Sequence, residues 1–172
     1  MKVAAVVTAC LGLVLLTGPA LARAAKPCRD THVISDAVRE ARAVRCLINR
    51  ERARHGLGLV KRNAALERAA VAYSRKMVRE KFFAHESPDG STPGGRIKAA
   101  GYRGNGYGET LAWGTGSLGD AAGTVKGWLN SPGHRAILLS KDMRVVGIGV
   151  ALGSPDRQFN SGETVTADFG TS

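Results

Sequence analysis

Apolar side chains recur at intervals of three and four residues in two consecutive stretches, 35–55 and 63–82. The apolar positions are Ala37, Ala41, Val44 and Ile48 in the first stretch, and Leu66, Ala70, Tyr73 and Met77 in the second. This spacing places each set on one face of a helix and predicts two amphipathic helices. Ser35 and Asn63 are expected to cap their starts, because a short polar side chain there accepts a hydrogen bond from a free backbone amide.

Shorter helical segments and two strands are predicted for the rest of the chain. The expected helices are 92–101, 117–129 and a last turn at 134–139, and the expected strands are 145–151 and 163–169. Thr92 and Ser117 are the expected caps of the first two. The glycine-rich stretch 101–116 indicates an irregular loop with at most a short strand. Helices first and strands last predict an α+β layered domain.

The N-terminus has the pattern of a secretory signal peptide, 1–22. Lys2 precedes an apolar run over 3–16, which is followed by the small-residue site Ala20-Leu21-Ala22. The run is too short for a membrane-spanning helix, which needs about 20 apolar residues. A lipoprotein signal at Cys10 is disfavoured, because the apolar stretch continues beyond it. We therefore expect a secreted protein with a lead at 23–34 and one domain at 35–172.

Two cysteines, Cys28 and Cys46, remain after such a signal is removed. An even count in a chain bound for an oxidising compartment favours a disulfide. This bond would tie the lead segment to the first helix and close a loop of roughly 18 residues, worth about 3 kcal/mol.

Basic residues outnumber acidic ones, with 25 Lys and Arg against 14 Asp and Glu and a formal charge of +11. Residues 31–81 alone hold thirteen basic and five acidic residues. This charge is compatible with a lipid head group or an anionic cell-surface polymer as partner, although a solvated helix face is the favoured explanation. No aromatic residues alternate with the arginines, so a nucleic-acid partner is not expected. No heptad or exposed apolar stripe argues for assembly, and a monomer is expected.

Two histidines and a glutamate stand out as candidate chemistry, each beside apolar or glycine neighbours. They are His85 after Phe82-Phe83-Ala84, Glu109 within Tyr107-Gly108-Glu109-Thr110, and His134 after Ser131-Pro132-Gly133. Two imidazoles and a carboxylate can bind Zn²⁺ or another divalent cation, with metal–ligand distances of roughly 2.0–2.2 Å. Such a set leaves one coordination position of the metal for water. We expect these three side chains to line one cleft.

Seven short motifs lie in order between residues 46 and 170. They are Cys46-Leu47-Ile48-Asn49 with Arg52, Phe83-Ala84-His85, Arg96 with Ala100-Gly101-Tyr102, Gly108-Glu109, Trp128 with Ser131-Pro132-Gly133-His134-Arg135, Val146-Gly147-Ile148-Gly149, and Ala167-Asp168-Phe169-Gly170. Together they resemble a bacterial member of the cysteine-rich secretory protein, antigen 5 and pathogenesis-related superfamily, the CAP or SCP domain. The resemblance implies an α-β-α sandwich with a small, mainly antiparallel sheet between helical layers.

The resemblance also implies a cleft, which in eukaryotic members is lined by two histidines and two acids. His85, His134 and Glu109 correspond to the two histidines and one of the acids. Ser131 stands where the family often has the second glutamate. The family is associated with lipid binding, extracellular signalling and defence, and protease activity has been proposed for some members. A fold alone does not decide among these.

Three functions are compatible with these residues. The expected one is a non-catalytic extracellular binding module whose cleft holds a small lipid, a cell-wall fragment or a cation. A metal-assisted hydrolase using the same residues is the alternative, although no catalytic base is assigned. A serine hydrolase built on Ser131, His134 and Glu109 is disfavoured, since Ser131 lies at a helix break and is expected to cap the following turn.

Overall fold

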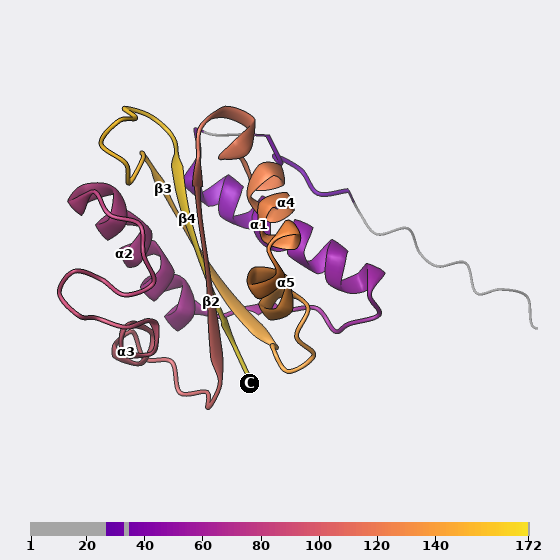
Figure 1. Ribbon diagram of the computed structural model, residues 1–172. Helices are drawn as coiled ribbons and strands as arrows, with labels where there is room; N and C mark the ends of the chain where they lie inside the picture. Colours follow the sequence, from indigo (N-terminus) through magenta and orange to yellow (C-terminus); the bar gives the residue numbers. More distant parts are fainter. Residues whose placement is uncertain (1–26, 33–34, 172) are drawn as a thin grey trace, which may run out of the picture.

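Five α-helices and four strands make up the part of the chain that the computed structural model describes, residues 27–32 and 35–171 (Figure 1). The helices are α1 (Ala37–Arg54), α2 (Ala64–Glu80), α3 (Pro93–Ala99), α4 (Ala121–Asn130) and α5 (Pro132–Leu138), with a 3₁₀ turn η1 at Gly116–Leu118. The strands are β1 (Lys61–Arg62), β2 (Tyr107–Gly114), β3 (Val145–Leu152) and β4 (Glu163–Gly170). The predicted signal peptide and Cys10 lie outside the described residues.

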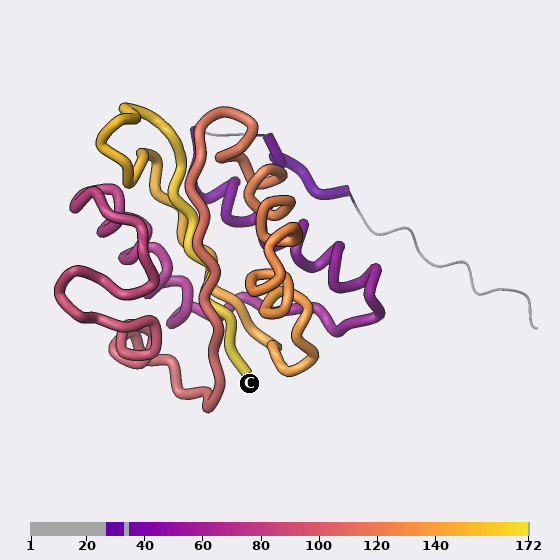
Figure 2. The backbone as a smooth tube through the Cα atoms, viewed as in Figure 1, coloured from indigo at the N-terminus to yellow at the C-terminus, as the bar shows by residue number. Residues whose placement is uncertain are grey.

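One four-stranded sheet in the order β1-β3-β4-β2 forms the middle layer. β4 pairs antiparallel with both β2 and β3, while β1 pairs parallel with β3. The backbone segments of β2, β4 and β3 lie side by side in Figure 2. Helices α2 and α3 lie on one side of the sheet, and α1, α4 and α5 lie on the other (Figure 1). The predicted α+β fold, a sandwich with a mainly antiparallel sheet, is confirmed. Within residues 27–32 and 35–171, no helix has the length and apolar content needed to cross a bilayer.

The two faces of β3 are packed in different ways. Val146, Ile148 and Val150 are buried in the main hydrophobic core with side chains from α1 and α4. Gly147 and Gly149 face α2, and a Cβ atom at either glycine would overlap the α2 backbone. The alternation of branched and glycine residues therefore lets a helix lie directly against one face of the strand.

Two predicted helix caps are displaced by nearby aspartates. Asp36, not Ser35, accepts hydrogen bonds from the first amides of α1, and Asp120, not Ser117, caps α4. Ser117 instead lies within the η1 turn. The predicted caps Asn63 and Thr92 are confirmed.

The stretch predicted as an irregular loop contains the eight-residue strand β2, which pairs along its whole length with β4. Its glycines concealed the strand pattern. Gly108 is required by packing, because a Cβ atom there would lie 2.9 Å from the side chain of Ile137 in α5. The two-residue strand β1 carries no periodic signal and was not predicted.

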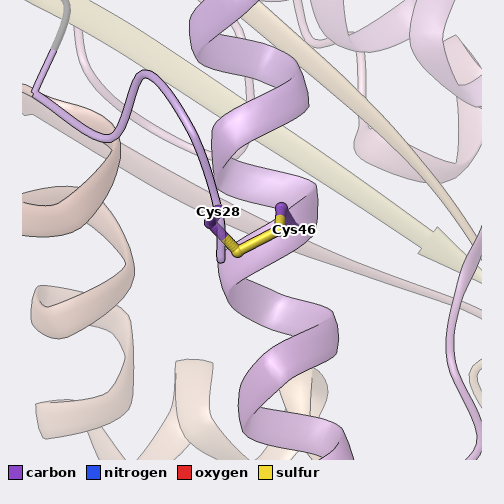
Figure 3. The surroundings of a disulfide bond; sticks show 2 residues. All are labelled: Cys28 and Cys46. Atoms are coloured by element: carbon purple, nitrogen blue, oxygen red, sulfur yellow. A yellow bond between two sulfur atoms is a disulfide. The ribbon is translucent and has the colours of Figure 1, made fainter. Parts of the chain in front are cut away.

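The disulfide between Cys28 and Cys46 is present and fastens the N-terminal lead to α1 (Figure 3). Its sequence separation is 18 residues. Replacing both cysteines by serine is expected to lower the free energy of unfolding by about 3 kcal/mol, because the unfolded chain regains the entropy of an open loop. Urea unfolding measures the change, and the wild type under reducing conditions is the matched control. An unchanged unfolding midpoint would contradict this.

Arg52 is fully buried in the last turn of α1, and every described partner of its guanidinium is a backbone carbonyl. Nε donates to Gly58 at 2.8 Å, Nη1 to Leu138 and Ser140 at 2.7 and 2.9 Å, and Nη2 to Met143 at 3.0 Å. One side chain therefore joins the end of α1, the end of α5 and the approach to β3.

Three buried carboxyl groups lie where α1, α4 and β4 meet. Asp120 accepts from the Gly123 amide at 2.7 Å and is 2.8 Å from Nδ1 of His32. Within the described residues, the carboxyl oxygens of Glu40 and Glu163 have no conventional hydrogen-bond partner. Burial is the largest cause that raises the pKa of Glu40, to about 10, and the neighbouring carboxyl group of Glu163 is the next largest. Burial also raises the pKa of the Glu163 carboxyl. At neutral pH, Glu40 therefore retains its proton.

Candidate functional site

Glu109 lies near the start of β2, opposite Asp168 of β4, and its side chain is only 3% exposed. Both carboxylate oxygens are bonded. Oε1 lies 2.7 Å from Nδ1 of His85, and Oε2 accepts a hydrogen bond from Nη2 of Arg96 at 2.7 Å. Glu109 therefore connects the loop after α2 to helix α3.

His85 is held through its backbone as well as its ring. Its carbonyl accepts hydrogen bonds from the Tyr73 hydroxyl at 3.1 Å and from Arg96 at 3.0 Å. The Arg96 guanidinium lies 3.3 Å from the centroid of the Tyr73 ring, a cation–π contact that fixes both groups. The His85 side chain remains 52% exposed. Its Nδ1 atom faces the protein, and Nε2 makes no hydrogen bond within residues 27–32 and 35–171.

His134 lies in the first turn of α5, beside His85. The two ring centroids are 6.5 Å apart and the rings are tilted by 52°. Partial burial is the main cause that lowers the pKa of His134, and the charge of the neighbouring His85 adds to it. The imidazole of His134 is therefore neutral at pH 7. The Trp128 indole N–H donates to the carbonyl of Leu111 at 2.9 Å, which fastens α4 to β2 and so brings α5 next to Glu109.

Asp168 was not predicted as a site residue. Burial, followed by the charge of Glu109, raises the pKa of Asp168 well above its ordinary range, and a hydrogen bond with Glu109 adds to this effect. Burial thus favours the neutral form of the Asp168 carboxyl, while Glu109 forms an ion pair with Arg96. In the sequence, the signal that could have identified Asp168 as a site residue is its place in the closing motif Ala167-Asp168-Phe169-Gly170.

Ser131 lies at the N-cap position of α5, as predicted, but its hydroxyl makes no capping hydrogen bond. In the described part of the chain it makes no hydrogen bond to His134 or Glu109 either. An activated serine nucleophile needs a base within about 2.6–3.2 Å. The site as it stands does not show the contact that a serine hydrolase requires.

The predicted ligands His85, Glu109 and His134 do come together from three segments. No three His, Cys, Asp or Glu side chains among residues 27–32 and 35–171 are arranged to hold a metal ion. At this site, His85 and Arg96 use both oxygens of Glu109. What the structure assembles is a pair of imidazoles, one of them oriented by a carboxylate.

An α-β-α sandwich with paired histidines against a buried glutamate defines a CAP-type domain. The model of the cysteine-rich secretory protein family matches residues 46–169, and this chain belongs to that family. It is 32% identical over 103 residues to the uncharacterized protein YkwD of Bacillus subtilis (strain 168), a match that covers 60% of this chain and 39% of YkwD. The chain thus spans well under half of that relative.

Two solved structures have the same fold. An extracellular protein containing an SCP domain from Bacillus anthracis str. Ames superposes with a TM-score of 0.69 at 27% identity, covering 79% of this chain and 41% of that one. An outer surface protein from Borrelia burgdorferi superposes with a TM-score of 0.61 at 25% identity, covering 75% of this chain and 90% of that one.

Proposed function

We propose that this chain is a secreted, non-catalytic binding protein whose His85, Glu109 and His134 site holds a small ligand. The similar structures include an extracellular protein and an outer surface protein, which supports an extracellular location. The signal-peptide pattern at 1–22 supports the same location.

The contact between His85 and Glu109 carries the proposal. A histidine that ligates a metal commonly gives its other ring N–H to a carboxylate, which fixes the tautomer and the ring orientation. Glu109 holds Nδ1 of His85 at 2.7 Å, and this leaves Nε2 available to a ligand. The neutral imidazole of His134 stands beside it. A divalent cation such as Zn²⁺ is the ligand that this arrangement supports best, with Glu109 orienting His85 rather than ligating.

Hydrolysis is the less favoured function for the same site. A metal-assisted hydrolase needs a base that can take a proton from the attacking water. Glu109 is a poor candidate because both of its oxygens are hydrogen-bonded, and Asp168 is a poor candidate because it is buried. The geometry therefore supports holding a ligand more than transforming one.

Calorimetric titration of Zn²⁺ into the mature protein at pH 7.5 tests this proposal. We expect binding that disappears in the His85→Ala, His134→Ala double variant. Glu109→Gln should weaken binding by roughly 10–100-fold, as loss of an orienting carboxylate does elsewhere. His55→Ala is the matched control, since His55 is exposed at the end of α1, and it should bind like the wild type.

Two outcomes would overturn the proposed cation site. One is a wild type that does not bind Zn²⁺, and the other is binding that persists unchanged in the double variant. Far-ultraviolet circular dichroism of each variant confirms that the comparison concerns folded protein.

A further inference from the structure

One edge of strand β3 is paired with another strand over only part of its length. β1 pairs with Val145 and Val146 alone, and the last bond of this ladder runs from the Asn63 amide to the Val146 carbonyl. β3 continues to Leu152, and among the described residues no strand lies beside it on that side beyond Val146. Backbone groups repeat their direction every two residues in a strand, so those of Ile148 and Val150 face the same open edge.

A groove of about 420 Å³ follows this open edge between α1 and α2. Ile148 and Val150 line its floor, and Ala37, Val38 and Ala41 of α1 face Val71 of α2 across it. Val38 is 61% exposed, which is unusual for an aliphatic side chain with a core so close. An unpaired strand edge between apolar walls is a surface that natural proteins usually protect.

Arginines dominate the rim of the groove. They are Arg42, Arg45, Arg62 and Arg75, against a single acid, Glu67. Arg62 forms an ion pair with Glu67. Within residues 27–32 and 35–171 the other three arginines have no ion-pair or hydrogen-bond partner, so the rim carries uncompensated positive charge.

We propose that the groove binds an extended acidic peptide segment of a partner protein, which adds to the sheet as a strand beside β3. Main-chain amides and carbonyls of the peptide pair with those of Ile148 and Val150, as in other cases of strand addition. Alternate side chains of the peptide contact the apolar walls, and its carboxylates meet the free arginines. A lipid chain satisfies the charge and the apolar walls but not the row of backbone donors and acceptors, and this favours a peptide.

The groove is separate from the His85 and Glu109 site. Glu109 lies on β2, at one edge of the sheet, whereas the open part of β3 faces the other edge. Neither histidine lines the groove. Failure of zinc binding and failure of peptide binding are therefore independent results.

An array of ten-residue peptides with alternating acidic and apolar residues, probed with the mature protein, is the first experiment. We expect members of the array to bind, and their lysine-substituted counterparts not to bind. Replacing both Arg42 and Arg75 by serine should weaken the best peptide about tenfold, because two exposed charge contacts are lost. Arg103→Ser is the matched control, an exposed arginine outside the groove, and should leave affinity unchanged.

Amide hydrogen exchange then distinguishes strand addition from loose electrostatic attraction. At a peptide concentration of ten times Kd, the amides of Ile148 and Val150 should exchange about tenfold more slowly, by mass action. A peptide methylated at alternate backbone nitrogens keeps its charges but loses its ladder donors, and should not bind. Equal binding of the methylated peptide, unchanged exchange at both amides, or an array without any binder overturns the proposal. Binding to phosphatidylglycerol vesicles that is lost in the double arginine variant, without binding of any peptide in the array, would overturn it as well.

Discussion

Replacing Arg52 by alanine is expected to lower the free energy of unfolding by about 3–5 kcal/mol. The variant leaves the carbonyls of Gly58, Leu138, Ser140 and Met143 without their donor. An unsatisfied buried acceptor costs about 1–3 kcal/mol, partly recovered where water enters. The empty volume of the guanidinium adds a cavity at the junction of α1 and α5. Urea denaturation followed by circular dichroism measures the loss.

Two matched variants isolate this effect. Arg50→Ala removes an exposed arginine from the same helix and should change stability by less than about 0.5 kcal/mol. Arg52→Lys keeps the positive charge but cannot reach all the acceptors with a single ammonium, and should fall between the wild type and Arg52→Ala. If Arg52→Ala unfolds at the same urea concentration as Arg50→Ala, the carbonyl network does not stabilise the fold.

Replacing Glu40 by glutamine is expected to remove a loss of stability that accompanies rising pH. The pKa of Glu40 is raised to about 10 in the folded state, from an ordinary value of 4.5. Between these values the folded protein binds more protons at this residue than the unfolded chain does, so stability falls as pH rises. One proton corresponds to about 1.4 kcal/mol per pH unit, or about 4 kcal/mol between pH 6 and 9. Glutamine carries its amide protons at every pH and has no such dependence.

Unfolding measured at half-unit intervals from pH 5 to 9 tests this expectation. The wild type should lose stability steadily across the range, while Glu40→Gln should be more stable than the wild type at pH 9 and similar to it at pH 5. Glu86→Gln, an exposed carboxylate outside the cluster, is the control and should follow the wild type. Parallel curves for wild type and Glu40→Gln would show that Glu40 does not hold a proton in the fold.

The helical part of the fold was predictable because α1 and α2 carry their apolar residues at helical intervals. Helix ends were less predictable, since Ser35 and Asp36 are both good caps and only the folded backbone decides which side chain reaches the free amides. β2 was concealed by its glycines. Position 108 holds a glycine because the side chain of Ile137 in α5 lies close to it. No local sequence pattern reveals this contact between two segments.

The histidines and the glutamate of the candidate site were predictable from the sequence, whereas the residues that hold them in place were not. His85, Glu109 and His134 stand in motifs whose order is specific. Arg96 on a short helix has the pattern of a solvated cation, and its contacts with Glu109 and Tyr73 exist only after three segments come together. The same packing leaves both oxygens of Glu109 hydrogen-bonded, one to His85 and the other to Arg96.

The count of charged residues in the sequence also gave no indication of the raised pKa of Glu40. Glu40 was one of five acids in a basic stretch and belongs by sequence to a solvated helix face. Its neighbour in the fold is Glu163, at the start of the last strand, and the two are brought together by the sandwich alone. Sequence periodicity locates a residue on a helix face but does not report what lies across from it.

The central place of β4 has a consequence for how the protein is made. β4 is synthesised after the other three described strands, yet it lies between β2 and β3, and all eight of its residues are buried. Until residue 170 has left the ribosome, β2 lacks the strand it pairs with and the sheet cannot close. The sheet of this domain therefore closes only after β4 is available.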